Sequence, residues 1–302
     1  MSKSQSLNAE IYQALHTGTF GDWQFYKSLV QKKLKLKKVK DKKAQDHATL
    51  NVLELGCGSG RILCELAELR IKLTGFELND ELLALCKANI SQRFDKTATA
   101  EIDYILGDFS KLEACFDQQG HQQKKYFDLI ILPYNGIYCL RNEEEQVQLI
   151  REAINLLAPQ GELWFDGYAL PDPSEYAYES ADEYSPLTVI DLGASKKRPE
   201  RVLGVEELDV FQIEQQRFTA HYRFVAPEEE IINEPLHGRI EQIEHRYLYP
   251  WQLPKLCQQA GAKIIKLMAD FGGQDMTATT DLRTACEWGI DAEHWVIGIT
   301  KA

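Results

Sequence analysis

The chain has 302 residues and a mass of 34.6 kDa, with 34 lysines and arginines against 46 aspartates and glutamates, so its formal net charge is −12 at pH 7. Its 44% hydrophobic and 26% charged residues exclude a fully disordered or fibrous protein. No apolar run approaches the roughly 18 residues that span a bilayer, and the polar N-terminus lacks the apolar core of a signal peptide. The acidic balance disfavours binding of the whole molecule to nucleic acid or anionic lipid. The length predicts about two domains, or one domain with a large insertion.

The seven cysteines are scattered along the chain and are never spaced as CxxC. This pattern argues against a disulfide framework and a structural zinc site, so we expect no bound metal. A reduced compartment suits these thiols, and without an export signal we expect the protein in the cytoplasm.

A basic block lies near the N-terminus, where nine lysines between Lys27 and Lys43 stand against one acid, Asp41. The block could form a patch that binds RNA or another anion. Alternatively, it is the solvated end of a helix that Leu29 and Val30 anchor. We favour the helix, because one short basic run on an acidic protein is a weak sign of nucleic-acid binding.

From Thr49 onward, strand-like and helical patterns alternate along the chain. Such alternation predicts a parallel sheet covered by helices on both faces. We expect strands at Leu50–Leu55, Ile71–Leu78, Ile102–Leu106, Phe127–Leu132 and Glu162–Phe165, and helices at Gly60–Arg70, Asp80–Ile90 and Asn142–Leu157.

The pattern changes after Leu170. Residues 171–186 are rich in proline, serine, tyrosine and acids, which is typical of a loop or lid. Alternating apolar residues then predict antiparallel strands, and about 80 residues are too many for a simple connection. The expected elements are antiparallel strands within Val202–Val225 and Arg239–Leu248, a helix at Pro250–Ala260, and strands at Lys263–Met268 and Glu293–Thr300.

Three glycines, Gly56, Gly58 and Gly60, lie between a predicted strand and a predicted helix. Glycine permits a tight turn and a close approach of ligand to backbone, and the helix N-terminus offers free N–H groups. Glu77 ends the second strand 23 residues after Glu54, a position from which a carboxylate can accept both hydroxyls of a ribose. We therefore predict a nucleoside cofactor, and Glu54 favours a cationic ligand over a pyrophosphate.

The segments ELGCGSGR, GFELND, LGDFSKL, FDLIILPYNGI and GELWFDGY occur in this order and resemble a class I S-adenosylmethionine (SAM)-dependent methyltransferase. The resemblance covers about Thr49 to Tyr168 and resumes from Tyr249. It implies an α/β fold: a Rossmann-like seven-stranded sheet with helices on both faces and an antiparallel last strand. An antiparallel β insertion between strand five and the last helix is also expected. The implied cofactor is SAM, and the product is S-adenosylhomocysteine (SAH).

The resemblance also implies roles for individual residues. Glu54 would orient the glycine loop or meet the amino group of the cofactor, and Arg61 would lie near its carboxylate. Glu77 would bind the ribose hydroxyls, and Asp108 would accept from the adenine amino group. The complete expected cofactor set is Tyr12, Glu54, Gly56, Cys57, Gly58, Gly60, Arg61, Glu77, Leu78, Gly107, Asp108, Phe109, Leu132, Pro133 and Asn135, with Tyr134 beside it.

The expected division of the chain has four parts. Residues 1–48 form an N-terminal helical flap similar to that of the glycine and sugar-amine N-methyltransferases, with Tyr12 near the sulfonium, although its aromatic residues could simply pack a helix on the core. Residues 49–169 form the cofactor-binding core, and residues 250–302 complete its sheet. Residues 170–249 form the β insertion, which in that subgroup roofs the substrate pocket and often pairs two subunits, so we expect a possible homodimer.

The expected reaction is methyl transfer to an amine or hydroxyl of a small molecule by in-line displacement, in which positioning supplies much of the rate. Tyr138, Asp166 and His245 are the candidate general bases. One alternative is an RNA or protein methyltransferase that uses the basic block, although Leu132-Pro-Tyr-Asn135 matches the [DN]PP[YF] signature only loosely. Another alternative is a non-catalytic, cofactor-binding partner subunit.

Overall fold

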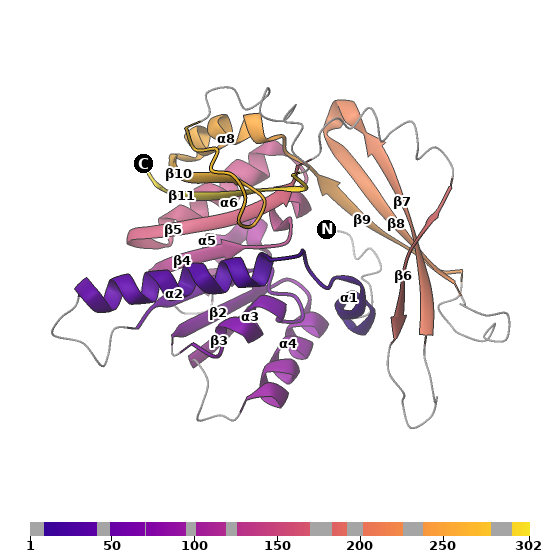
Figure 1. Ribbon diagram of the computed structural model, residues 1–302, viewed down its shortest axis with the longest axis horizontal. Helices are drawn as coiled ribbons and strands as arrows, with labels where there is room; N and C mark the ends of the chain where they lie inside the picture. The colour runs from indigo at the N-terminus through magenta and orange to yellow at the C-terminus, as the bar shows by residue number, and fades with distance from the viewer. Residues whose placement is uncertain are drawn as a thin grey trace. The chain divides into compact units, whose positions relative to one another are not determined.

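The computed structural model describes residues 9–40, 49–69, 71–94, 101–118, 126–169, 183–191, 202–225, 238–278 and 292–302 (Figure 1). The chain divides into two compact units. Residues 18–170 and 248–302 form the core unit, and residues 1–17 and 171–247 form the insertion unit. The predicted N-terminal flap, residues 1–48, is therefore divided at Gly18 between the two units.

The core unit is built on a seven-stranded sheet with the order β10-β11-β5-β4-β1-β2-β3. Strands β1 to β5 pair in parallel, whereas β11 runs antiparallel to both of its neighbours, β5 and β10. The predicted Rossmann-like sheet with an antiparallel last strand is thus confirmed. The strands are β1 (Asn51–Leu55), β2 (Lys72–Glu77), β3 (Glu101–Leu106), β4 (Phe127–Leu132), β5 (Leu157–Tyr168), β10 (Ala262–Ala269) and β11 (His294–Lys301).

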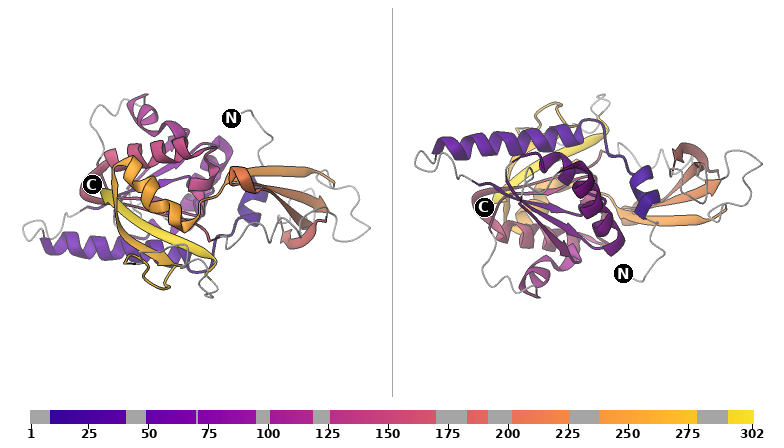
Figure 2. Two further views of the ribbon diagram at one scale, coloured as in Figure 1. Left: turned by 90° about the horizontal axis from the view of Figure 1, so that it is seen from above. Right: turned by 90° about the horizontal axis from the view of Figure 1, so that it is seen from below.

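Helices cover both faces of this sheet (Figure 2). One face carries a hydrophobic cluster to which α2, α3 and α4 contribute, with Tyr26, Leu63 and Cys86 among its buried members. Asn79 caps α4 by accepting from two backbone amides, and Asn142 caps α6 in the same way with one. The helical segments are α2 (Asp22–Lys40), α3 (Arg61–Leu66), α4 (Asp80–Arg93), η1 (Phe109–Lys111), α5 (Leu112–Gln118), η2 (Gly136–Cys139), α6 (Glu143–Asn155), η5 (Pro250–Gln252) and α8 (Leu253–Ala260).

Two boundaries of the core differ from the sequence-based expectation by four or five residues, more than the others. The helix expected at Gly60–Arg70 ends as an α-helix at Leu66. Strand β5 begins at Leu157, five residues before the expected start, because Leu157 already pairs with Phe127 of β4. The proline and glycine at positions 159 and 161 therefore lie inside an irregular strand and do not form a separate loop.

The basic block lies in α2 as far as the described residues extend. Val30 is fully buried, so this helix is anchored on the core as expected. Lys27 pairs with Glu65 and Glu68, while Lys33 and Lys37 pair with acids at positions 162 and 128. The predicted helix is confirmed, and three lysines of the block already have carboxylate partners, while binding of RNA or another anion to the block stays untested. The remainder of the block, residues 41–43, lies outside the described residues.

The insertion unit contains a four-stranded antiparallel sheet with the order β6-β7-β8-β9. Helix α1 (Ala9–Leu15) contacts β6 within this unit. The antiparallel insertion is therefore confirmed, whereas its pairing of two subunits stays a prediction. The strands are β6 (Ser185–Asp191), β7 (Val202–Gln212), β8 (Arg217–Val225) and β9 (Ile240–Arg246), with η3 (Ile213–Gln215) between β7 and β8. No helix among the described residues is both long and apolar enough to span a membrane.

Candidate functional site

The strand order places a topological switch between β1 and β4. From β1 the chain continues to β2 and β3 toward one edge of the sheet, and from β4 it continues to β5 toward the other. The loops that follow β1 and β4 therefore diverge at the carboxyl ends of two adjacent strands. In open α/β sheets, ligands bind in the crevice at such a point. The predicted glycine loop follows β1, and Leu132–Asn135 lie at and after the end of β4.

The glycine loop has a left-handed backbone at Gly56, Gly58 and Gly60, with φ of 67°, 53° and 88°. The Cys57 amide donates to the Phe76 carbonyl at 3.0 Å, which ties the loop to β2. A Cβ added at Gly60 would lie 2.5 Å from the Cys86 sulfur. Glycine at position 60 is thus required both by its backbone conformation and by the lack of space.

Replacing Gly60 with alanine is expected to lower the free energy of unfolding by roughly 2–4 kcal/mol, because the left-handed backbone strain and the clash with Cys86 add. Denaturant-induced unfolding measures this loss. Ser59→Ala, one residue earlier in the same loop, is the matched control and is expected to remain close to wild type. A Gly60→Ala protein as stable as wild type would contradict the geometry of this loop.

Glu77 at the end of β2 braces the loops on either side of it. One carboxylate oxygen accepts from the Gly58 amide at 2.8 Å, and the other accepts from the Leu78 and Asn79 amides, each at 2.9 Å. Burial raises the pKa of Glu77, and these three backbone bonds oppose the rise. Leu78, the next residue, remains 45% exposed. A carboxylate and an exposed apolar side chain therefore lie together at this strand end, and their roles toward a ribose and an adenine stay predictions.

Glu54 is buried beneath the glycine loop, with 2% of its surface exposed. Within the part of the chain that the structure describes, its Oε2 has no hydrogen-bond partner. Burial raises the pKa of Glu54 well above its usual value, and the charge of Arg61 opposes this rise. An orphaned buried carboxylate oxygen costs free energy unless a donor reaches it. A ligand ammonium group would supply such a donor.

The third strand end contributes Asp108, which caps η1 by accepting from the Ser110 amide at 2.9 Å. The Gly107 amide donates to the Glu77 carbonyl at 2.8 Å, so the ends of β2 and β3 are joined. A Cβ at Gly107 would lie 2.7 Å from the Phe76 ring, which leaves no space for a side chain there. The structure thus brings the predicted residues after β1, β2 and β3 to one edge of the sheet.

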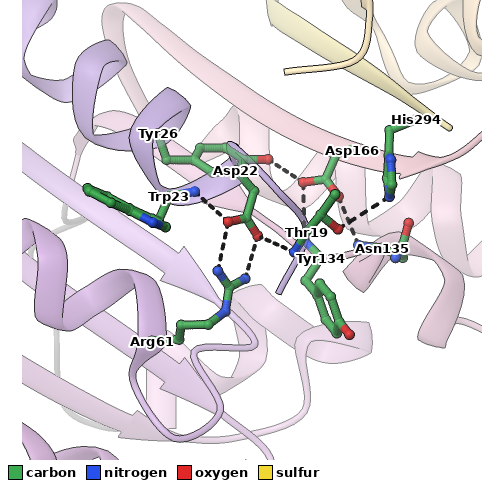
Figure 3. A network of polar contacts seen from close by, with 9 residues as sticks. All are labelled: Thr19, Asp22, Trp23, Tyr26, Arg61, Tyr134, Asn135, Asp166 and His294. Atoms are coloured by element: carbon green, nitrogen blue, oxygen red, sulfur yellow. Dashed lines mark hydrogen bonds and ion pairs between the residues drawn. The ribbon is translucent and has the colours of Figure 1, made fainter. Parts of the chain in front are cut away.

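The loop after β4 is held by Asp166 of β5 (Figure 3). Tyr134 and Asn135 both have a left-handed backbone, with φ of 58° and 57°, and their amides donate to Asp166. Leu132, the last residue of β4, is buried. Asn135 is 3% exposed, and among the described residues its Oδ1 has no partner. A second orphaned polar atom therefore lies in the loop beside the crevice.

Arg61 is bound by an acid that the sequence analysis did not assign. Its two terminal nitrogens donate to the two carboxylate oxygens of Asp22 at 2.8 and 2.6 Å, and Asp22 is fully buried (Figure 3). The Thr19 and Trp23 amides donate to the same carboxylate. The guanidinium also lies 5.5 Å from the centre of the Tyr134 ring. In this structure the Arg61 guanidinium is paired with Asp22. Its contact with the carboxylate of a ligand therefore stays a prediction.

The three candidate general bases belong to different units, Tyr138 and Asp166 to the core unit and His245 to the insertion unit. Tyr138 is fully buried, its hydroxyl donates to the Tyr168 carbonyl at 2.8 Å, and burial raises its pKa. Asp166 is fully buried and accepts three hydrogen bonds. His245 belongs to the insertion unit, where it stacks on Phe218 and burial lowers its pKa to about 4. Burial and structural bonds therefore argue against Tyr138 and Asp166 as proton acceptors for a substrate.

Tyr12, the residue expected near the sulfonium, lies in α1 of the insertion unit. Its ring contacts that of His16, with centroids 4.3 Å apart. Its approach to a cofactor stays a prediction. Phe20 and Trp23 belong to the core unit and are exposed, by 99% and 37%. Among the described residues, no group of three His, Cys, Asp or Glu could hold a metal ion.

A family model described as a methyltransferase domain matches residues 52–161, which span β1 through the first part of β5. The chain contains a methyltransferase domain. The match includes the glycine loop, Glu77, Asp108 and the loop after β4, so the methyltransferase domain predicted from the sequence is confirmed. The seven-stranded sheet is that of the class I methyltransferase fold.

Curated and solved relatives agree with this domain. The Bacillus subtilis (strain 168) protein named "Putative methyltransferase YqeM" is 25% identical over 115 residues, 38% of this chain and 41% of that protein. The match thus spans less than half of that relative. A SAM-dependent methyltransferase from Clostridium acetobutylicum ATCC 824 has the same fold at a TM-score of 0.62, with 12% identity over 97% of both chains. SAM-bound CalS10, an amino pentose methyltransferase from Micromonospora echinaspora, matches at 0.53, with 14% identity over 95% and 96%.

Proposed function

We propose that this methyltransferase binds SAM at the carboxyl ends of β1, β2 and β3 and transfers its methyl group to an amine or hydroxyl of a small molecule. The observation that carries the proposal is the orphaned Oε2 of Glu54, buried beneath a left-handed glycine loop and accompanied by Glu77 at the next strand end. A ligand with an ammonium group and a ribose diol would satisfy both carboxylates. SAM has both groups, and its positive charges suit this acidic site.

The residues of this site hold and orient a ligand. Glu54 would accept from the amino group, Glu77 from the ribose hydroxyls, and Asp108 from the adenine amino group. SAM supplies an electrophilic methyl group and a neutral sulfide leaving group, so the protein has to bring the acceptor into line. Positioning of this kind contributes several kcal/mol to a displacement reaction. Backbone amides bonded to Glu77 and Asp166 fix the loops on both sides of the crevice.

Of the two acceptor classes, the site favours an amine. A neutral amine needs no base before it attacks, whereas a hydroxyl requires removal of a proton. In the core unit, which holds the glycine loop, the candidate bases Tyr138 and Asp166 are buried and engaged in hydrogen bonds, which leaves neither available for that removal, and the third candidate, His245, belongs to the insertion unit. Asn135 Oδ1 is an acceptor that could receive an N–H but could not carry a proton away. The CalS10 relative is itself described as an amino pentose methyltransferase, which accords with an amine.

Methyl transfer from radiolabelled SAM to a panel of acceptors tests this proposal. The panel contains amino sugars and small primary and secondary amines, matched hydroxyl compounds lacking the amine, total RNA and a protein mixture. We expect label in one or more amines at a rate at least tenfold above that in the matched hydroxyl compounds. Label confined to RNA or protein would overturn the small-molecule assignment. Labelling of a hydroxyl compound in preference to its amine would overturn the amine assignment alone.

A further inference from the structure

Asp166 accepts three hydrogen bonds from two distant parts of the core unit. Its Oδ1 accepts from the Tyr26 hydroxyl of α2 at 2.5 Å and from the Tyr134 amide at 3.1 Å. Its Oδ2 accepts from the Asn135 amide at 3.0 Å. Figure 3 shows the carboxylate between α2 and the loop after β4. One side chain of β5 therefore connects both segments.

The loop that Asp166 binds has a conformation that its residues do not favour. Tyr134 and Asn135 are consecutive non-glycine residues with left-handed backbones. Backbone strain disfavours each such residue, asparagine less than tyrosine, so the surroundings must hold the pair in place. The two adjacent amides point to the same carboxylate, and this is the arrangement in which successive N–H groups surround an anion. Asp166 thus provides the anion that stabilises this turn.

The turn determines where Asn135 presents its side-chain amide. Asn135 is only 3% exposed, and among the described residues no donor reaches its Oδ1. The loop begins where β4 ends, beside β1 at the switch point of the sheet. The Tyr134 ring lies against the Arg61 guanidinium, which itself follows the glycine loop. A change in the turn would therefore move groups on the wall of the crevice.

We propose that Asp166 is a positioning residue for methyl transfer: by holding the amides of Tyr134 and Asn135, it fixes the loop after β4 and aims the Asn135 amide at the acceptor, while Tyr26 couples this loop to α2. The inference rests on the proposed function. Asp166 takes no proton from the acceptor in this account, because both of its carboxylate oxygens already accept hydrogen bonds that hold the structure.

An aspartate suits this role better than its amide. Asparagine has a single acceptor oxygen, so Asp166→Asn leaves at least one backbone amide of the turn without its partner. Burial raises the pKa of Asp166 to about 6, and the hydrogen bonds from Tyr26 and the backbone oppose this rise. The ionisable groups that face Asp166 are Tyr26, Tyr138 and Asp22. Asp22 is itself paired with Arg61. The charged form is therefore present above about pH 6, at a cost in stability that the bonds to the turn only partly offset.

The test compares Asp166→Asn with two other variants, using SAH titration and steady-state methyl transfer to the best acceptor of the panel. We expect Asp166→Asn to lower kcat at least tenfold while the dissociation constant of SAH changes less than threefold. Tyr26→Phe keeps both backbone bonds and is expected to lower kcat by an intermediate amount. Asp128→Asn is the matched control, because Asp128 accepts from Lys37 and the Asn51 amide near the opposite end of β4. We expect that control to lose stability without losing kcat.

A nuclear magnetic resonance titration tests the same proposal without any acceptor. In wild type, the backbone amide resonances of Tyr134 and Asn135 are expected to shift together between about pH 5 and 7, and in Asp166→Asn this shift is expected to disappear. An unchanged kcat in Asp166→Asn, or resonances of the two amides that are the same in Asp166→Asn as in wild type, would overturn the positioning role. Equal losses of kcat and SAH affinity would show a merely structural role. Failure of wild type to bind SAH would instead overturn the proposed function, and the amide titration would still report on the turn.

Discussion

Replacing Glu77 with alanine is expected to raise the dissociation constant of SAH at least 100-fold. Each hydrogen bond between a carboxylate and a ribose hydroxyl contributes roughly 1.5–3 kcal/mol, and two of them would be lost. The same substitution removes the acceptor of the Gly58, Leu78 and Asn79 amides, so the loops after β1 and β2 lose a common anchor. Calorimetric titration of SAH into the folded variant measures the effect.

The control for this prediction is Glu81→Ala, which removes an exposed carboxylate four residues later on α4. Because Glu81→Ala changes the net charge equally and keeps the backbone amide that donates to Asn79, the affinity of this variant for SAH should match that of wild type. Asp108→Ala should weaken binding by a smaller factor than Glu77→Ala, since adenine recognition shares its energy with the apolar contact of Leu78. Retention of wild-type affinity by a folded Glu77→Ala protein would show that the cofactor does not bind through this strand end.

Replacing Asp22 with alanine is expected to lower the free energy of unfolding by about 3–5 kcal/mol. Breaking a buried ion pair leaves the remaining charge without compensation. Asp22 is fully buried and accepts both terminal nitrogens of Arg61, and the Thr19 and Trp23 amides also lose their acceptor. At roughly 2–4 °C per kcal/mol, the melting temperature should fall by about 10 °C.

Thermal unfolding of four variants, Asp22→Ala, Arg61→Ala, the double variant and a control, separates the ion pair from its parts. Glu144→Ala, an exposed acid in the first turn of α6, is the control and should leave the melting temperature within about 2 °C of wild type. The double variant Asp22→Ala/Arg61→Ala should lose less stability than the sum of its single changes, because the double variant leaves no unpaired charge from this ion pair. Additive losses would mean that the two side chains stabilise the fold independently, contrary to the geometry in Figure 3.

The sequence predicted the strands of the core well because each strand is marked by residues that are close together in the chain. Strand β4 was expected at Phe127–Leu132 and lies there, since a short all-apolar run between polar residues is typical of a strand buried on both faces. Glu77, Leu78, Gly107 and Asp108 likewise lie at strand ends, where a parallel sheet brings them to one edge. Boundaries were less accurate: β5 extends to Leu157 through the backbone pairing with Phe127, which no property of the local sequence announces.

The contacts missed by the sequence analysis join residues far apart in the chain. Tyr26 and Asp166 are separated by 140 residues, and Asp22 and Arg61 by 39. An aspartate at the start of a helix is typical of a helix N-terminus, so nothing marked Asp22 as the partner of an arginine. Asp166 was noticed as a candidate base, yet only its burial and its three donors indicate a positioning role. The identity of such residues depends on tertiary packing, which a single sequence does not display.

The most direct test of the account is a calorimetric titration of SAH into the wild-type protein. The carboxylates of Glu54 and Glu77 and the left-handed glycine loop predict one site per chain with a dissociation constant in the micromolar range. SAM should compete for the same site. Absence of heat and of competition from a protein shown to be folded would contradict the assignment of these strand ends to the cofactor.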